Sequence, residues 1–166
     1  MLLALAAFHI AVLLAAAALL IAAAINDARH YRIPNIVCAA LLVLFPIFVI
    51  TAPRSIEWEQ NLMVFGLMLI SGFVMFIGSL AGAGDIKLLA ATGLWAGPHL
   101  VAVFLIMTAI AGGVLALTIA LLAYIRNFSG KQAVAVAKVP IPYGIAIAVG
   151  GLSTIYKLSQ PILFPG

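Results

Sequence analysis

Two aspartates are the residues of this sequence best placed to do chemistry. Asp27 ends the first long apolar run, and Asp85 follows the string Gly82-Ala83-Gly84 at the start of a later one. Two carboxylates within a few ångström share a proton, because a neighbouring like charge raises the pKa of one of them. The ionised member can then activate water while the protonated member polarises a carbonyl. Such a pair could hydrolyse a peptide bond without a metal ion.

Each aspartate also has a purely structural interpretation. Asp85 could cap a helix after the glycine-rich turn, and Asp27 could be an interfacial charge paired with Arg29 or Arg32. Lys87 could stabilise an ionised Asp85 or simply extend to the membrane interface. A position of both aspartates on one face of the membrane would favour the functional interpretation.

The glycines beside Asp85 have a chemical consequence of their own. Gly82 and Gly84 permit positive φ and let a substrate strand lie close to the backbone. The string is not a phosphate loop, because it ends in an acid and not in the Lys-Ser or Lys-Thr of a nucleotide site. By itself it is weak evidence for any one function.

Other titratable residues are predicted to play no part in the site. Glu57 and Glu59 form a solvated pair in a polar loop. His30 lies beside Asp27, but His9 falls inside the first apolar run, where we expect an interhelical hydrogen bond, and His99 falls at the opposite face. We therefore predict no metal ion and no cofactor.

The elements that position the aspartates are predicted to be membrane helices. The chain has 166 residues, of which 67% are hydrophobic and only 7% charged, too few charges to cover a soluble surface. We predict an all-α polytopic membrane protein, with about six transmembrane helices in one bundle and a single domain over residues 1–166. The expected spans are 2–25, 33–50, 62–80, 85–97, 100–125 and 139–156, with a turn at Pro98 and His99 between the fourth and fifth.

The distribution of charge predicts the orientation. Loops after the first, third and fifth spans carry most of the basic residues and should be cytoplasmic, which puts both termini outside and both aspartates at the cytoplasmic face. The net charge of +4 is spread too thinly for nucleic-acid binding. The basic residues on the cytoplasmic side are Arg29, Arg32, Lys87, Arg126, Lys131 and Lys138, against Arg54 and Lys157 on the other.

Three segments carry a resemblance that covers nearly the whole chain. They are Asp27 with Arg29, Arg32 and Ile33-Pro34-Asn35; Gly82-Ala83-Gly84-Asp85-Ile86-Lys87-Leu88-Leu89; and Val139-Pro140 with Pro142-Tyr143-Gly144 and Ala146-Ile147-Ala148. In order and helical position they resemble the three motifs of the prepilin peptidases, which belong to the GxGD aspartyl proteases. Together they are far more specific than the GxGD string alone.

The resemblance implies a function and a set of site residues. Asp27 and Asp85 would be the catalytic pair that removes the leader of type IV prepilins at the cytoplasmic face of the cell (inner) membrane. Larger members carry an additional N-terminal methylating segment with paired cysteines; this sequence has only Cys38 and resembles the short, peptidase-only type associated with Flp-type pili. Residues that would shape the site or hold substrate are Arg29, Pro34, Asn35, Gly82, Gly84, Lys87, Pro142, Tyr143 and Gly144.

Other functions remain open at this point. Archaeal preflagellin peptidases are similar in design. Presenilin-like intramembrane proteases also use GxGD, but they place the first aspartate deep in a helix and carry a Pro-Ala-Leu motif that is missing here. A small proton-coupled transporter would place an acid near the bilayer midplane, and a structural assembly protein would tolerate Asp85→Asn. The partners expected for the peptidase are a prepilin substrate and membrane lipid.

Overall fold

The computed structural model of the chain is an assembly of long helices that describes residues 2–53, 55–128 and 141–163. Within these ranges there is no strand, which confirms the all-α prediction. The helices are α1 (Leu2–His30), α2 (Asn35–Thr51), α3 (Trp58–Ile77), α4 (Ala83–Phe128) and α5 (Tyr143–Leu163).

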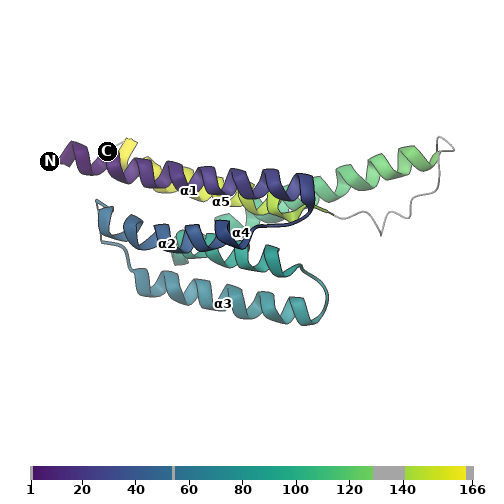
Figure 1. Cartoon of the computed structure of the whole chain (residues 1–166), viewed down its shortest axis with the longest axis horizontal. Coiled ribbons are helices and arrows are strands. Elements are labelled where there is room, and N and C mark those ends of the chain that lie inside the picture. Colours follow the sequence, from purple (N-terminus) through teal and green to yellow (C-terminus); the bar gives the residue numbers. More distant parts are fainter. Residues whose placement is uncertain (1, 54, 129–140, 164–166) are drawn as a thin grey trace.

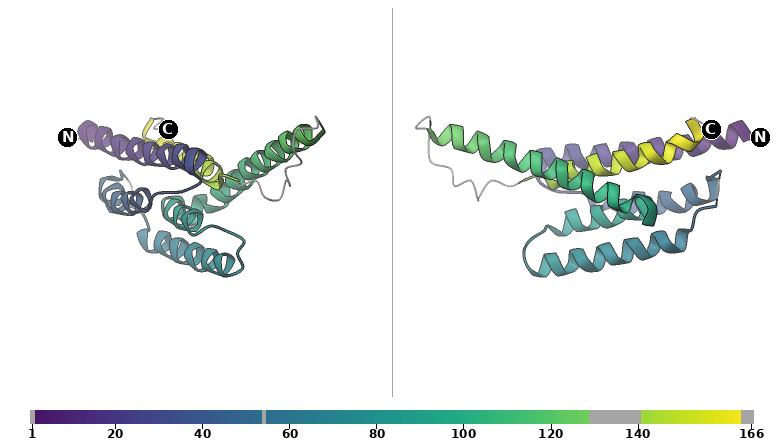
Figure 2. Two further views of the ribbon diagram at one scale, coloured as in Figure 1. Left: turned by 45° about the vertical axis from the view of Figure 1, so that its right-hand side comes forward. Right: turned by 180° about the vertical axis from the view of Figure 1, so that it is seen from behind.

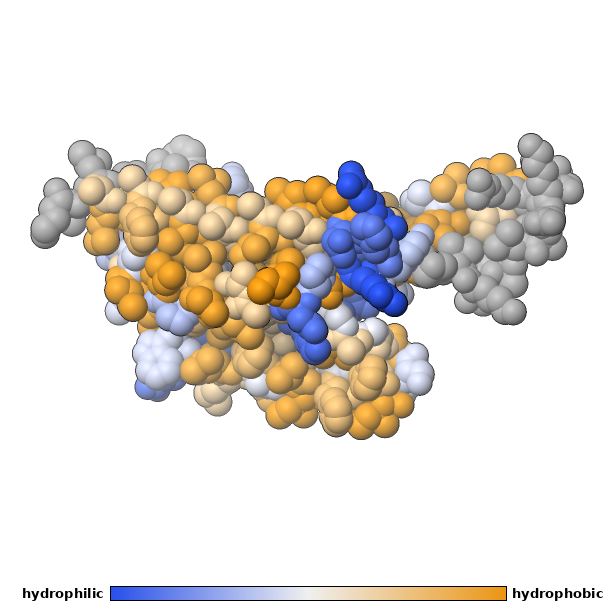
Figure 3. Space-filling view, viewed as in Figure 1, coloured by the Kyte–Doolittle hydropathy of each residue, from blue (hydrophilic) through white to orange (hydrophobic). Residues whose placement is uncertain are grey.

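Several of these helices suit a lipid environment. Ala4–His30, Trp58–Ile77 and Ala83–Ile125 are long and apolar enough to cross a membrane, and Asn35–Thr51 is a shorter apolar helix. Large apolar side chains cover much of the outer surface, as the space-filling view shows (Figure 3). The helices therefore indicate a multi-pass membrane protein.

The predicted count of six spans is not confirmed, because the described residues form five helices. The spans expected at 85–97 and 100–125 are two arms of α4, which kinks at Gly97 with φ 56° and ψ −172°. Pro98 was expected to mark a turn, yet a proline without N–H fits the first turn of the second arm. Asn61 of α3 supports the kink, since its Nδ2 donates to the Leu94 carbonyl at 2.7 Å.

The first helix is longer than predicted. We expected it to end at residue 25, but α1 continues to His30. Charged side chains are excluded from hydrocarbon, not from a helix, so the last turn of α1 can extend past the apolar stretch. Tyr31 ends the helix with φ 52°, and its N–H donates to the Asp27 carbonyl at 2.8 Å. Asp27 is therefore helical and does not lie in a loop.

Other helix ends differ from prediction by a few residues. Pro34 is the N-cap of α2 in extended conformation and not part of its first turn. The third helix begins at Trp58, where we expected residue 62, and ends at Ile77, where we expected residue 80. The last helix begins at Tyr143; Val139 and Pro140, where we placed its start, lie outside the described residues.

With the two arms of α4 taken separately, successive helical segments alternate in direction, so their connections gather at two ends of the bundle (Figure 1). Figure 1 shows α1 and α5 side by side, with the N- and C-terminal ends of the chain at the same end. α5 packs against both α1 and α4, and α3 packs against α4. The second arm of α4 diverges from the other helices (Figure 2). The α1–α2 and α3–α4 connections and the start of α5 lie together at the end away from the termini (Figure 1).

An aromatic cluster stabilises the end of the bundle at which the two termini lie. The ring of Phe48 lies 5.0 Å from those of both His9 and Trp95. His9, which is 2% exposed, is hydrogen bonded through Nδ1 to Thr51 Oγ1 at 2.9 Å. This contact joins α1 to α2 and confirms the interhelical bond expected for His9. Cys38 of α2 is buried.

Close packing of α5 on α4 gives a first testable prediction. A Cβ on Gly150 would lie 2.7 Å from the Phe104 carbonyl oxygen and would also collide with Thr108. Because the backbone at Phe104 cannot move without a large energetic cost, Gly150→Ala should lower the free energy of unfolding by about 1–3 kcal/mol. Thermal unfolding in detergent measures the change, with Gly113→Ala as control because nothing lies within 4 Å of that position. Equal stability of the two variants would contradict this packing.

Candidate active site

The structure brings the two predicted aspartates together at one end of the bundle. Asp27 lies near the end of α1 with its side chain only 4% exposed. Asp85 is half-buried in the first turn of α4. The two carboxyl groups are near enough for their charges to interact. One acid comes from the end of a helix and the other from the start of a helix, with 57 residues between them in sequence.

The start of α5 holds the carboxyl group of Asp27. The Gly144 N–H donates to Asp27 Oδ2 at 2.7 Å. A carboxylate near the C-terminal end of α1 faces the negative end of that helix dipole, and the free N–H at the start of α5 offsets this. A Cβ on Gly144 would lie 2.9 Å from both Cβ and Oδ2 of Asp27. The two helices therefore meet where only a glycine fits.

The glycines before Asp85 have separate roles. α4 begins at Ala83, so Gly82 is at the cap position and Asp85 is not the N-cap that one interpretation expected. A Cβ on Gly82 would lie 2.9 Å from Asp85 Oδ2, whereas one on Gly84 would lie 3.3 Å from Ile33 Cβ. Both glycines thus permit close approach. Neither has positive φ, which falls on Ser79 instead, at 56°.

Two predicted supporting residues tie α2 to α4. Lys87 Nζ donates to Asn35 Oδ1 at 3.1 Å, and both side chains are exposed. This bond joins the start of α2 to α4 at Lys87, which lies two residues after Asp85. Lys87 therefore binds a neutral side chain in the described part of the chain.

The α1–α2 connection is held by a residue that the sequence analysis overlooked. The Asn26 side chain donates to the Arg32 carbonyl and closes this loop. Arg29 and Arg32 are exposed, and within the described ranges neither forms an ion pair with Asp27. An asparagine one residue before a candidate catalytic acid, with a proline soon after the loop, is the signal that could have suggested this bond.

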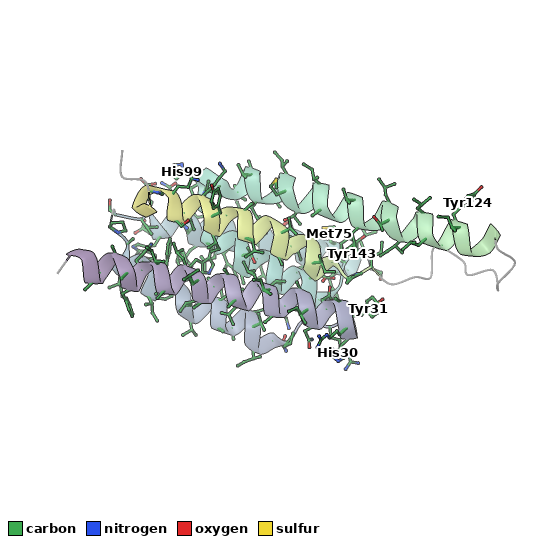
Figure 4. The ribbon with its side chains drawn as sticks, turned by 90° about the horizontal axis from the view of Figure 1, so that it is seen from above. His30, Tyr31, Met75, His99, Tyr124 and Tyr143 are labelled. Atoms are coloured by element: carbon green, nitrogen blue, oxygen red, sulfur yellow. The ribbon has the colours of Figure 1, made fainter. Side chains whose placement is uncertain are left out.

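An open cleft of about 670 Å³ lies beside the two aspartates. One wall contains Gly82, which touches the Asp85 carboxyl group, and another contains Tyr143, which precedes the residue bound to Asp27. Figure 4 shows Tyr143 at the same end of the bundle as His30 and Tyr31, with His99 at the opposite end. The residues that line the cleft are Phe76, Ile77, Ser79, Leu80, Ala81, Gly82 and Tyr143.

A hydrophilic patch marks the surface at this end of the bundle. It lies over the end of α1 in Figure 3, where Arg29, His30 and Arg32 are exposed. Pro142 is buried directly before α5. Arg54, Lys131 and Lys138, which entered the orientation argument, lie outside the described residues, as does the side chain of Arg126.

Comparison with known proteins gives one match. The model of the type IV leader peptidase family matches residues 14–117. This segment contains Asp27, Asp85 and the glycines between α3 and α4. No curated protein and no solved structure matches the chain.

Proposed function

The chain belongs to the type IV leader peptidase family, and from this we propose that it is a membrane aspartic endopeptidase that removes the leader of Flp-like type IV prepilins. Asp27 and Asp85 are its catalytic pair. The observation that supports this proposal is that carboxyl groups from α1 and α4 lie at one end of the bundle, each next to a residue that lines an open cleft. The test is processing of a co-expressed prepilin, read as a gel shift, with and without each aspartate.

The chemistry follows from two carboxyl groups that share one proton. The ionised carboxylate takes a proton from water as the water oxygen attacks the scissile carbonyl carbon. The protonated carboxyl group gives its proton to the carbonyl oxygen. The carboxyl group that took its proton from water then gives that proton to the leaving nitrogen, while the other carboxylate takes a proton from a hydroxyl of the tetrahedral intermediate. The C–N bond breaks, and a new carboxyl group and a new amine are released. The pair ends with one proton, as it began.

The position of the two aspartates at the end of the bundle suits a substrate that enters from the membrane. A peptide bond inside a lipid-exposed helix is shielded from water and cannot be extended there without losing hydrogen bonds. At the interface, the apolar segment of the prepilin can stay in the bilayer while its leader remains in the cytoplasm. An apolar groove of about 500 Å³ between α3 and α4 includes Ala83, Ile86 and Lys87 and leads to the turn that holds Asp85.

The orientation follows from the same arrangement. Both ends of the chain lie away from the aspartates, at the other end of the bundle (Figure 1). Exposed Arg29, Arg32 and Lys87 lie near the aspartates, whereas Lys157 lies toward the end of α5. Basic residues favour the cytoplasm, so the proposal places the active site at the cytoplasmic face, both termini outside and residues 1–166 in one membrane-embedded domain.

Sharing of one proton predicts a pH optimum. At low pH both carboxyl groups are protonated and no base remains, while at high pH both are ionised and no acid remains. The rate of cleavage should therefore fall on both sides of the optimum. Purified enzyme in detergent, with saturating synthetic prepilin, would provide the profile. A rate that stays constant across the pH range in which the enzyme remains folded would count against the shared proton.

A further inference from the structure

The cleft is lined by residues that adjoin the two aspartates, although neither aspartate is itself among the lining residues. Gly82 lines it, and the backbone of Gly82 is hydrogen bonded to the Asp85 carboxyl group. Tyr143 also lines it, and the next residue donates its N–H to Asp27. A molecule in the cleft therefore lies between the two helix starts that hold the carboxyl groups.

The turn between α3 and α4 offers an unpaired peptide group to the cleft. The N–H groups of Gly78, Ser79 and Leu80 all bond back to α3, at 3.1, 2.9 and 2.9 Å. Ala81 follows them and is half-buried in the cleft wall. In the described part of the chain, neither its N–H nor its carbonyl takes part in a hydrogen bond. An extended peptide could satisfy both groups, since its own backbone lacks internal partners.

Much of the rest of the wall is apolar and exposed, with Ser79 as a polar member. Leu80 and Ile77 are 73% and 70% exposed, and Tyr143, across the cleft, is 45% exposed. Such side chains can enclose one apolar substrate side chain while the substrate backbone lies along the turn.

We propose that this cleft binds an extended stretch of the substrate polypeptide next to the scissile bond, with its backbone on Ala81 and an apolar side chain between Leu80 and Tyr143. The proposal rests on the peptidase function proposed above. It makes Tyr143 a specificity-determining residue that acts in binding. A lipid chain is the competing occupant, and the experiment below separates the two.

Photo-crosslinking tests which molecule occupies the cleft. p-Benzoylphenylalanine in place of Leu80, in an Asp85→Asn background that leaves substrate uncut, should crosslink to a co-expressed epitope-tagged prepilin. The same probe in place of Ile50, which is 81% exposed at the opposite end of α2, is the control. A prepilin adduct at Leu80 and not at Ile50 supports the proposal. Adducts to lipid alone at Leu80, while prepilin still copurifies with the enzyme, would overturn it.

Kinetics of Tyr143 variants test the apolar wall. Tyr143→Ala should raise KM by about tenfold with kcat little changed, because a binding contact is lost and the carboxyl groups stay in place. Tyr143→Phe should keep the wild-type KM, since the ring remains. Tyr156→Ala, a change of an exposed tyrosine toward the other end of α5, is the control. An unchanged KM in Tyr143→Ala would show that the Tyr143 ring does not contribute to substrate binding.

The results that would disprove substrate binding in the cleft differ from those that would disprove the peptidase function. If Asp27→Asn and Asp85→Asn still process prepilin, the function proposed above is wrong. If both are inactive but Leu80 yields no prepilin adduct, the function stands and only the cleft assignment is lost.

Discussion

Asp27→Asn and Asp85→Asn should each reduce prepilin cleavage at least about 1,000-fold, the largest effect expected of any single change in this chain. Each substitution removes a group that must gain or lose a proton during hydrolysis, and an amide does neither. Asparagine keeps nearly the same shape, and its amide oxygen can still accept the N–H of Gly144 at position 27. The loss should therefore be chemical and not a result of unfolding.

The design of this experiment separates chemistry from folding. Wild type and both variants are compared for membrane level and for thermal unfolding in detergent, and cleavage is read as a gel shift of the prepilin. Glu59→Gln is the control, because it neutralises an exposed carboxylate at the start of α3, away from the site. Full processing by either aspartate variant would refute the catalytic pair and return attention to a proton-coupled transporter or a structural assembly protein.

The meeting of Asp27 and Asp85 could be anticipated from the sequence alone. Each lies at the edge of an apolar run, and the two predicted crossings between them, an even number, put both edges on the same face. Charges at the end of the first run were enough to place Asp27 near the interface, although they did not show that α1 continues to His30. Hydropathy reports where lipid ends; it does not report where a helix ends.

The break between the two arms of α4 was predicted within a residue of Gly97, where the structure has it, but its form could not be anticipated in the same way. Pro98 is a familiar turn signal, and a helix break there gave the count of six spans. The structure instead absorbs the change of direction at Gly97, whose φ of 56° combined with ψ of −172° is a conformation that only glycine adopts at low cost. Asn61 reaches this point from another helix, 33 residues before its partner Leu94. A single sequence carries no direct signal of such a long-range contact.

The role of Gly144 is the part of the site that sequence reasoning left undecided. A tyrosine and a glycine after two prolines could have lined a site or merely capped a bundle. The structure shows that the Gly144 N–H reaches the Asp27 carboxyl group, 117 residues earlier in the chain. The cleft could not be predicted from the sequence either. Its shape depends on the turn that follows α3, in which Ser79 has φ 56°.

Gly144→Ala should lower kcat by about 100-fold, the second-largest effect we expect, because small displacements of a catalytic group have large costs. The added methyl group would lie 2.9 Å from Asp27 Oδ2, so either the carboxyl group rotates or the start of α5 moves away. In both cases the hydrogen bond of 2.7 Å is lost or weakened. Single-turnover cleavage measures the effect, with Gly66→Ala as control because nothing lies within 4 Å of that glycine.

Neighbouring residues at the start of α5 should then show opposite kinetic signatures. Tyr143 lines the cleft and should act on KM, whereas Gly144 contacts Asp27 and should act on kcat. A general loosening of α5 would instead change both parameters in both variants and lower the unfolding temperature. Wild-type kcat in Gly144→Ala would mean that Asp27 keeps its working position without α5, and that the close fit of these helices serves stability alone.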